Sequence, residues 1–163
     1  MINNKLKMTD YVQFVRIDQT IQVPVKAATK VTAGQWVYYS VGATALAANS
    51  PKNALGVAVH TADNSSGVIG DLELTIATRG LIKAPAVVEA SGFTNTIAVG
   101  DRLTLGGDAG TSVADGQGLV DGLTASAAGD LVEFAEGLVV AIALGDLGAS
   151  STDTDLEAIL CIH

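Results

Sequence analysis

Cysteine, aromatic side chains and charge are all scarce in this chain of 163 residues. Its single cysteine excludes a disulfide scaffold and a cysteine-based zinc site, which needs about two to four thiolates. Charged residues make up 16% and aromatic residues 4% of the chain, where an ordinary soluble domain has about 25% charged residues. The net charge of −8 argues against a protein that follows nucleic acid through its phosphates. The best apolar run, residues 137–145, falls far short of the roughly 20 residues that a membrane-spanning helix needs.

Residues suited to catalysis are equally few. The two histidines, His60 and His163, are too isolated to make a case for acid–base chemistry. Residues 106–112 are glycine-rich but lack the lysine of a phosphate-binding loop. Acidic residues alternate over positions 153–157 and could hold a hard cation, although a solvated acidic loop explains them better. We therefore expect no enzyme activity, no cofactor and no metal.

Charge is unevenly distributed along the chain. All nine basic residues lie at or before position 102, whereas residues 103–163 carry ten acids and no base. The first 30 residues have a net charge of +3. Such an asymmetry suggests two surfaces with different tasks, one that docks and one that faces solvent. The alternative is that the loops are acidic for solubility alone. The polar N-terminus also lacks the apolar stretch of a signal peptide, so we expect synthesis in a reducing cytoplasm.

The hydrophobic pattern predicts β-structure almost throughout. Residues 21–25, 72–79 and 156–163 alternate between apolar and polar side chains, as half-buried strands do; Leu72 is expected to face inward with its apolar neighbours. Turn clusters rich in Gly, Asp and Asn separate these runs. Pro24 within the first run places that strand at a sheet edge or at a strand start. The alanine-rich residues 42–49 could form one or two helical turns.

We therefore predict an all-β fold, a compact β-sandwich or barrel with at most one short helix. An N-terminal arm of residues 1–19 would precede a single β-domain of residues 20–163. A possible internal pseudo-repeat is visible as three weak matches in the same order. They pair residues 31–37 with 97–103, residues 54–59 with 135–140, and residues 71–74 with 155–158. The first match puts Gly34 and Gly100 in equivalent turns, where we expect a positive φ.

Two groups of residues are candidates for contact with a partner. The first is the apolar and basic arm, which could add a strand to a partner's sheet or could belong to the chain's own sheet. The second is the aromatic cluster in residues 35–40, whose alternation places Trp36 and Tyr38 on one side and Val37 and Tyr39 on the other. These aromatics could be interface anchors or core residues. The candidate partner-binding residues are Lys5, Lys7, Tyr11, Phe14, Arg16, Trp36 and Tyr38.

The order of segments resembles the capsid decoration, or cement, proteins of tailed bacteriophages. The stretches that carry the resemblance are residues 26–35, 55–59, 74–85, 97–103 and 156–162. Together they cover residues 20–163 discontinuously. The long acidic Gly/Ala stretch, residues 106–130, and the extended arm depart from the family's pattern.

The resemblance implies a structural role on the outer surface of the virion, after synthesis in the host cytoplasm. Such proteins bind the outside of an expanded head as homo-oligomers, here expected to be a trimer or else a dimer, and clamp neighbouring major capsid subunits. On this hypothesis the basic N-terminal region docks on the shell and the acidic C-terminal half faces solvent, without contact to nucleic acid or membrane. The alternative is a head- or tail-attached receptor- or glycan-binding β-module, which predicts an exposed Trp36 or Tyr38 in a groove.

Overall fold

A computed structural model describes residues 11–45, 54–87, 96–106, 118–121, 139–148 and 152–162 of the chain. Within these residues the fold is all-β, sandwich-like rather than a closed barrel, and it contains no helix. The strands are β1 (Gln13–Pro24), β2 (Thr29–Val31), β3 (Trp36–Tyr39), β4 (Ala43–Ala45), β5 (Ala54–Ala58), β6 (Ala62–Asn64), β7 (Glu73–Val87), β8 (Arg102–Gly106), β9 (Gly118–Asp121), β10 (Ala141–Ala143) and β11 (Thr152–Cys161). Of the alanine-rich segment expected to be helical, residues 43–45 form β4 instead, and residues 46–49 lie outside the described residues.

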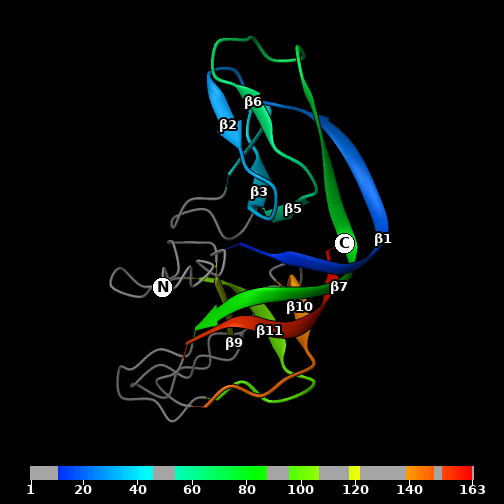
Figure 1. Ribbon diagram of the computed structural model, residues 1–163, viewed down its shortest axis with the longest axis vertical. Helices are drawn as coiled ribbons and strands as arrows, with labels where there is room; N and C mark the ends of the chain where they lie inside the picture. The colour runs from blue at the N-terminus through cyan, green and yellow to red at the C-terminus, as the bar shows by residue number, and fades with distance from the viewer. Residues whose placement is uncertain are drawn as a thin grey trace, which may run out of the picture.

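Two long strands, β1 and β7, form a bent antiparallel ribbon that joins the two ends of the molecule (Figure 1). Their register shifts at bulges in the middle of β1, where the ribbon bends. Gly80 lies at this bend, and a Cβ at this position would overlap the backbone oxygen of Arg16. β1 pairs with β7 alone among the described strands, so it is an edge strand, as Pro24 predicted.

The described strands form two copies of one β-unit, which confirms the expected pseudo-repeat. The first unit, residues 20–77, has the strand order β7–β5–β3–β4, and the second unit, residues 81–159, has the order β11–β10–β8–β9. β7 belongs to both: its first half is the last strand of the first unit, and its second half is the first strand of the second unit. The first unit begins with the second half of β1 and the residue after it, and the second unit begins with the second half of β7. These segments meet β4 and β9 in parallel pairs, Val25 with Ala43 and Ala86 with Leu119.

The glycine turns of the two units are equivalent. Gly34 has φ +84° and Gly100 has φ +95°, as predicted from the sequence. The Gly34 N–H donates to the Ala58 oxygen at 2.8 Å, and the Gly100 N–H donates to the Ala143 oxygen at the same distance. These bonds align residues 34 and 58 of the first unit with residues 100 and 143 of the second.

Side-chain hydrogen bonds repeat in the same way. In each unit a side chain of the turn accepts from the backbone N–H three residues before it, and a side chain three residues past the end of β5 or β10 accepts from the next N–H. The pairs in the first unit are Thr32 N to Gln35 Oε1, 2.7 Å, and Ala33 N to Thr61 Oγ1, 3.0 Å; in the second unit they are Ala98 N to Asp101 Oδ2, 2.8 Å, and Val99 N to Asp146 Oδ1, 2.9 Å. The residue types differ, but the acceptors occupy the same places, so the geometry of the turn is repeated.

The structure has two hydrophobic cores, and the core of the first unit has buried equivalents in the second, larger core, which also takes in Trp36, Val57 and Ala77 from the first unit. The core of the first unit consists of Val25, Val31, Val37, Ala43, Ala58, Ala62, Leu74 and Ile76. Seven of its equivalents, all buried in the second core, are Ala86, Ile97, Leu103, Ala143, Leu147, Leu156 and Ala158. The same alternating positions therefore drive burial in both units, since each strand turns every second side chain inward.

The structure corrects two of the three sequence matches behind the repeat. Residues 31–37 do correspond to residues 97–103. Ala58, however, corresponds to Ala143, which places the equivalent of residues 54–59 at residues 139–144, four residues beyond the predicted match. Leu74 corresponds to Leu156, two residues before the predicted position. Both errors are even-numbered shifts, which leave an alternating pattern unchanged and are therefore invisible to a comparison based on hydrophobicity.

Candidate interaction surfaces

The loop between β6 and β7, residues 65–72, is held rigidly at one end of the molecule (Figure 1); we call it the tip loop. Asn64 at its base is only 2% exposed, and its amide donates to the backbone oxygens of Val25, Lys26 and Val68 at 3.4, 3.3 and 2.9 Å. Inside the loop the Asp71 carboxylate accepts from the Val68 N–H at 2.8 Å. The loop is thus fixed by buried and local hydrogen bonds.

Electrostatics reinforce the start of the tip loop. The Asp63 carboxylate accepts hydrogen bonds from the hydroxyl and the backbone N–H of Ser65 and lies 3.6 Å from the Lys30 ammonium. These hydrogen bonds, and then the charge of Lys30, lower the pKa of Asp63 despite some desolvation. The contacts at the start of the tip loop therefore favour the ionised form of this carboxylate.

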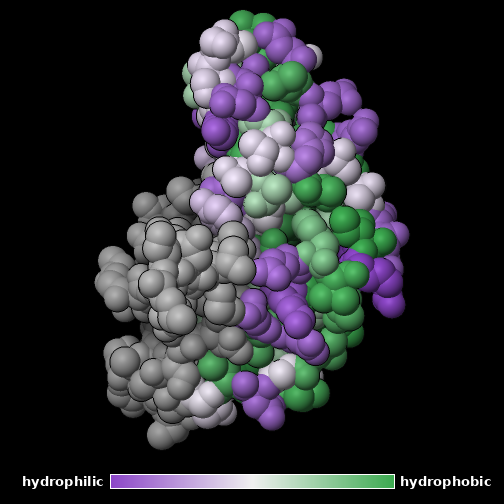
Figure 2. All heavy atoms as spheres, in the orientation of Figure 1, coloured by the Kyte–Doolittle hydropathy of each residue, from purple (hydrophilic) through white to green (hydrophobic). Residues whose placement is uncertain are grey.

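The tip loop presents three apolar side chains to solvent. Val68 is 64%, Ile69 42% and Leu72 39% exposed. Figure 2 shows hydrophobic residues among hydrophilic ones at this end of the molecule. The sequence prediction placed Leu72 in the core with Leu74, but β7 begins at Glu73, and Leu72 belongs to the loop. Three exposed apolar side chains on one hydrogen-bonded loop make the tip loop a candidate contact surface.

The N-terminal arm is partly built into the chain's own fold. Lys5 and Lys7 lie outside the described residues. Tyr11 is half-buried beside the Gly34 turn, and Phe14 is half-buried against the second core. The Val12 N–H donates to the Gly34 oxygen at 2.9 Å. Residues 13–19 thus belong to the chain's own sheet, one of the two alternatives considered above; whether any arm residue also binds a partner stays a prediction.

The first half of β1 keeps one edge and several side chains exposed. Val15 is 55% and Ile17 38% exposed. The exposed Arg16 forms a two-pronged ion pair with Asp18, with Nε–Oδ1 at 2.7 Å and Nη2–Oδ2 at 3.0 Å. The hydrogen bond from Arg16 lowers the pKa of Asp18, and the same bond raises the pKa of Arg16. Apolar and paired charged side chains therefore alternate along an open strand edge.

The aromatic cluster divides as the alternation predicted, with Trp36 and Tyr38 on one side. Trp36 is fully buried in the core of the second unit, and Tyr38 is half-buried against the same cluster. Tyr39, not among the predicted contacts, is 45% exposed. The burial of Trp36 is what core packing requires, whereas a glycan-binding module would present Trp36 or Tyr38 in a groove. An anchoring role for Trp36 or Tyr38 remains a prediction.

The repeat explains why Trp36 is buried. Trp36, Val57 and Ala77 form a row across β3, β5 and β7 that faces away from the first core and joins the second. The equivalent row in the second unit is Arg102, Ile142 and Ile159. There Arg102 is exposed, Ile142 half-buried and Ile159 42% exposed. The outer face of the first unit thus packs on the second unit. Trp36 lies on this face and is buried by that contact.

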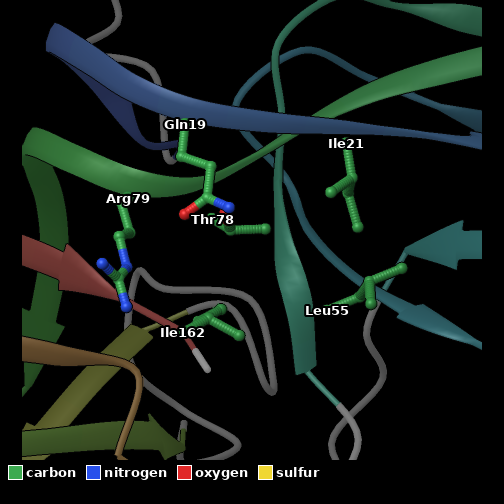
Figure 3. Close-up of a pocket in the computed structure, with 6 residues that line it drawn as sticks. All are labelled: Gln19, Ile21, Leu55, Thr78, Arg79 and Ile162. Carbon is green, nitrogen blue, oxygen red and sulfur yellow. The ribbon is translucent and has the colours of Figure 1, made fainter.

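A hollow of about 460 Å³ lies beside the bend of the ribbon (Figure 3). Its lining residues, from β1, β5, β7 and the end of β11, are Gln19, Ile21, Leu55, Thr78, Arg79 and Ile162. Thr78 is 7% exposed, and its Oγ1 has no hydrogen-bond partner in the described part of the chain. In the second unit the positions equivalent to Ile21 and Leu55 are the fully buried Ile82 and the nearly buried Val140. The first core is therefore partly exposed to the hollow at Ile21 and Leu55, whereas the equivalent positions of the second core are buried.

His60 and Cys161, which the sequence leaves as possible reactive groups, lie near the ends of β5 and β11. His60 accepts from the Thr75 N–H at 3.1 Å through Nε2 and bridges the end of β5 to β7. Burial raises the pKa of the Cys161 thiol, an effect opposed by the charges of Arg79 and Arg102. Across the described ranges no three His, Cys, Asp or Glu side chains gather in a way that could hold a metal ion. The same ranges include no helix long and apolar enough to cross a membrane.

Comparison with known proteins gives a distant structural likeness. No protein-family model matches the chain, and no curated protein matches its sequence. Among solved structures, the chain is similar to the N base of head fiber gp8.5 in bacteriophage phi29, with 16% identity and a TM-score of 0.45. The match covers 87% of this chain and 94% of that one. A likeness this weak carries no argument about function.

Proposed function

We propose that this chain is a capsid decoration protein of a tailed bacteriophage. It binds the outer surface of the expanded head as a homo-oligomer and stabilises contacts between neighbouring major capsid subunits. The role is structural and includes no catalytic step. The segment resemblance described above is the starting point for this proposal, and the duplicated all-β architecture is compatible with it.

The observation that carries the docking step is the tip loop. An interface needs apolar side chains that are already ordered, because ordering them on binding costs free energy. Val68, Ile69 and Leu72 satisfy this condition, since Asn64 and Asp71 hold the loop in one conformation. Residues 1–10, with Lys5 and Lys7, would add a basic contact to an acidic patch of the shell.

The benefit to the capsid follows from linkage. A ligand that binds only the assembled state stabilises that state, by about 2.7 kcal/mol at a free concentration 100 times its Kd. Copies that each bridge two capsid subunits add this contribution at every site on the shell. Modest affinity per copy is therefore sufficient for a large effect on the particle.

The proposal is tested with expanded heads and three variants of the full chain. Val68→Ser with Ile69→Ser removes apolar surface from the tip loop and is expected to weaken head binding at least tenfold. Val99→Ser is the matched control, because Val99 is 61% exposed in a turn of the second unit. Deletion of residues 1–10 tests the basic contact without removing Val12 or Phe14. Head binding unaffected by both the tip-loop change and the deletion contradicts the proposed docking surface.

A further inference from the structure

The turn between β3 and β4, residues 40–42, has an unusual backbone conformation. Val41 has φ +53° and Gly42 has φ +105°. Where a hairpin turn needs a positive φ at two consecutive residues, Asn-Gly is the preferred pair, because asparagine and glycine tolerate the left-handed region. Valine branches at its Cβ and is among the side chains least suited to this region. The chain therefore carries valine at a position where asparagine or glycine would be more stable.

Val41 is also the most exposed large apolar side chain in the described part of the chain, at 74%. A side chain this exposed gains little from burial, so packing within the chain does not offset the strain. Of the described residues other than glycine, only Ala28 shares the positive φ of Val41, and alanine lacks the branch at Cβ. Strained residues of this kind gather at binding and switch sites, where a function retains them.

The β3–β4 turn is fixed to the backbone of Lys26. The Lys26 N–H donates to the oxygen of Ala43, the residue directly after the turn, at 3.0 Å. A Cβ on Gly42 would lie 2.6 Å from the Lys26 Cα, so only glycine permits this close approach. Within the turn the Ser40 N–H donates to the Gly42 oxygen at 3.1 Å. Val41 is therefore presented to solvent on a turn that is held by hydrogen bonds and close packing.

The tip loop is fixed to the same short segment, residues 25 and 26. The Asn64 amide donates to the Lys26 oxygen at 3.3 Å, and the Val25 N–H donates to the Leu72 oxygen at 2.9 Å. The β3–β4 turn and the tip loop thus flank one piece of backbone that holds both. This arrangement brings the exposed side chain of Val41 and those of the tip loop to the same end of the molecule.

We propose that Val41 belongs to the same head-binding surface as the apolar side chains of the tip loop, and that its strained conformation is retained because it holds an apolar side chain toward the capsid. This inference rests on the proposed function, in which the partner is a capsid subunit. Val41, like Val68, Ile69 and Leu72, has a side chain that forms no hydrogen bond or ion pair. The capsid area that fits them is therefore apolar and wide enough to contact both loops. A relaxed polar residue at position 41 would stabilise the free chain and weaken the contact.

Val41→Asn separates the strain from the contact. Asparagine adopts a positive φ more readily than valine and has a polar side chain. The melting temperature of the isolated chain is expected to rise by about 2–4 °C. The Kd for expanded heads is expected to rise about fivefold or more, because an apolar contact is lost. Val41→Leu, which stays apolar without the branch at Cβ, is expected to keep the Kd within about twofold of the wild type.

Val99→Asn is the matched control, because Val99 is 61% exposed in a turn and has no positive φ. It is expected to leave both the melting temperature and the Kd unchanged. The inference is overturned if Val41→Asn keeps the wild-type Kd, if it fails to raise the melting temperature, or if Val41→Leu weakens binding as much as Val41→Asn. Each of these results leaves the proposed function standing, whereas absence of wild-type binding to heads overturns the function itself.

Discussion

At the scale of single residues, the two glycine turns show how one backbone requirement is met in two environments. Both Gly34 and Gly100 have a positive φ, which any L side chain adopts at a cost of about 1 kcal/mol. Their surroundings differ. A Cβ on Gly34 would lie 2.5 Å from the Val12 oxygen and 2.9 Å from the Tyr11 Cβ, whereas a Cβ on Gly100 would meet nothing within 4 Å. The described residues of the arm therefore pack against the Gly34 turn and leave the Gly100 turn uncovered.

This difference predicts unequal effects of the same substitution. Gly100→Ala should lower the free energy of unfolding by about 1 kcal/mol, the conformational cost alone. Gly34→Ala should lower it by about 3 kcal/mol or more, because Tyr11 and Val12 must also move away. Urea unfolding of both variants measures this. Equal losses would show that the arm does not pack on the Gly34 turn in solution.

At the scale of structural elements, the sequence predicts which face of each strand is buried. It does not predict which side chains at the ends of a strand are exposed to solvent. The runs around Leu74 and Leu156 form strands with the predicted inward faces. Alternate side chains of a strand point to opposite faces of the sheet, so the apolar set of an alternating run identifies the buried face. Trp36 was ambiguous because both faces of β3 are buried, one in each core. The tip loop was missed, although its signal was present: Val68 and Ile69 directly follow a turn cluster, where no strand can bury them.

The tip loop predicts a local effect for its buried amide. Asn64→Ala removes the donor of three hydrogen bonds and should lower the free energy of unfolding by about 2 kcal/mol. Backbone amides of residues 65–71 should exchange with solvent faster, with little change in the second unit. Head binding should also weaken, since Val68 and Ile69 would no longer be held in place. Hydrogen exchange that is unchanged in the loop would refute the role given to Asn64.

At the scale of the whole molecule, duplication accounts for both the shape and the unequal surfaces. Two small units share β7, and the outer row of the first unit is buried on the second through Trp36. The equivalent Arg102 faces solvent because nothing in the described chain packs on that side. Of the seventeen charges behind the predicted split between a basic N-terminal region and an acidic C-terminal half, eight lie outside the described residues, and the split stays a prediction.

Trp36 provides a test of how the units are joined. Trp36→Phe should lower the free energy of unfolding by about 2 kcal/mol through lost packing between the units. Affinity for heads should stay unchanged, because a buried side chain contributes nothing directly to an external interface. Parallel measurements of unfolding and of head binding decide between a core residue and an anchor. A large loss of affinity at unchanged stability would favour the anchor.

The most direct test of the proposed function is co-sedimentation of the wild-type chain with the expanded heads of its own phage and with unexpanded shells. The account predicts saturable binding to expanded heads, at a fixed number of copies per capsid, and greater resistance of the decorated heads to heat. Binding to the unexpanded shells should be much weaker. Absence of the chain from the expanded-head pellet at saturating concentration would contradict the account.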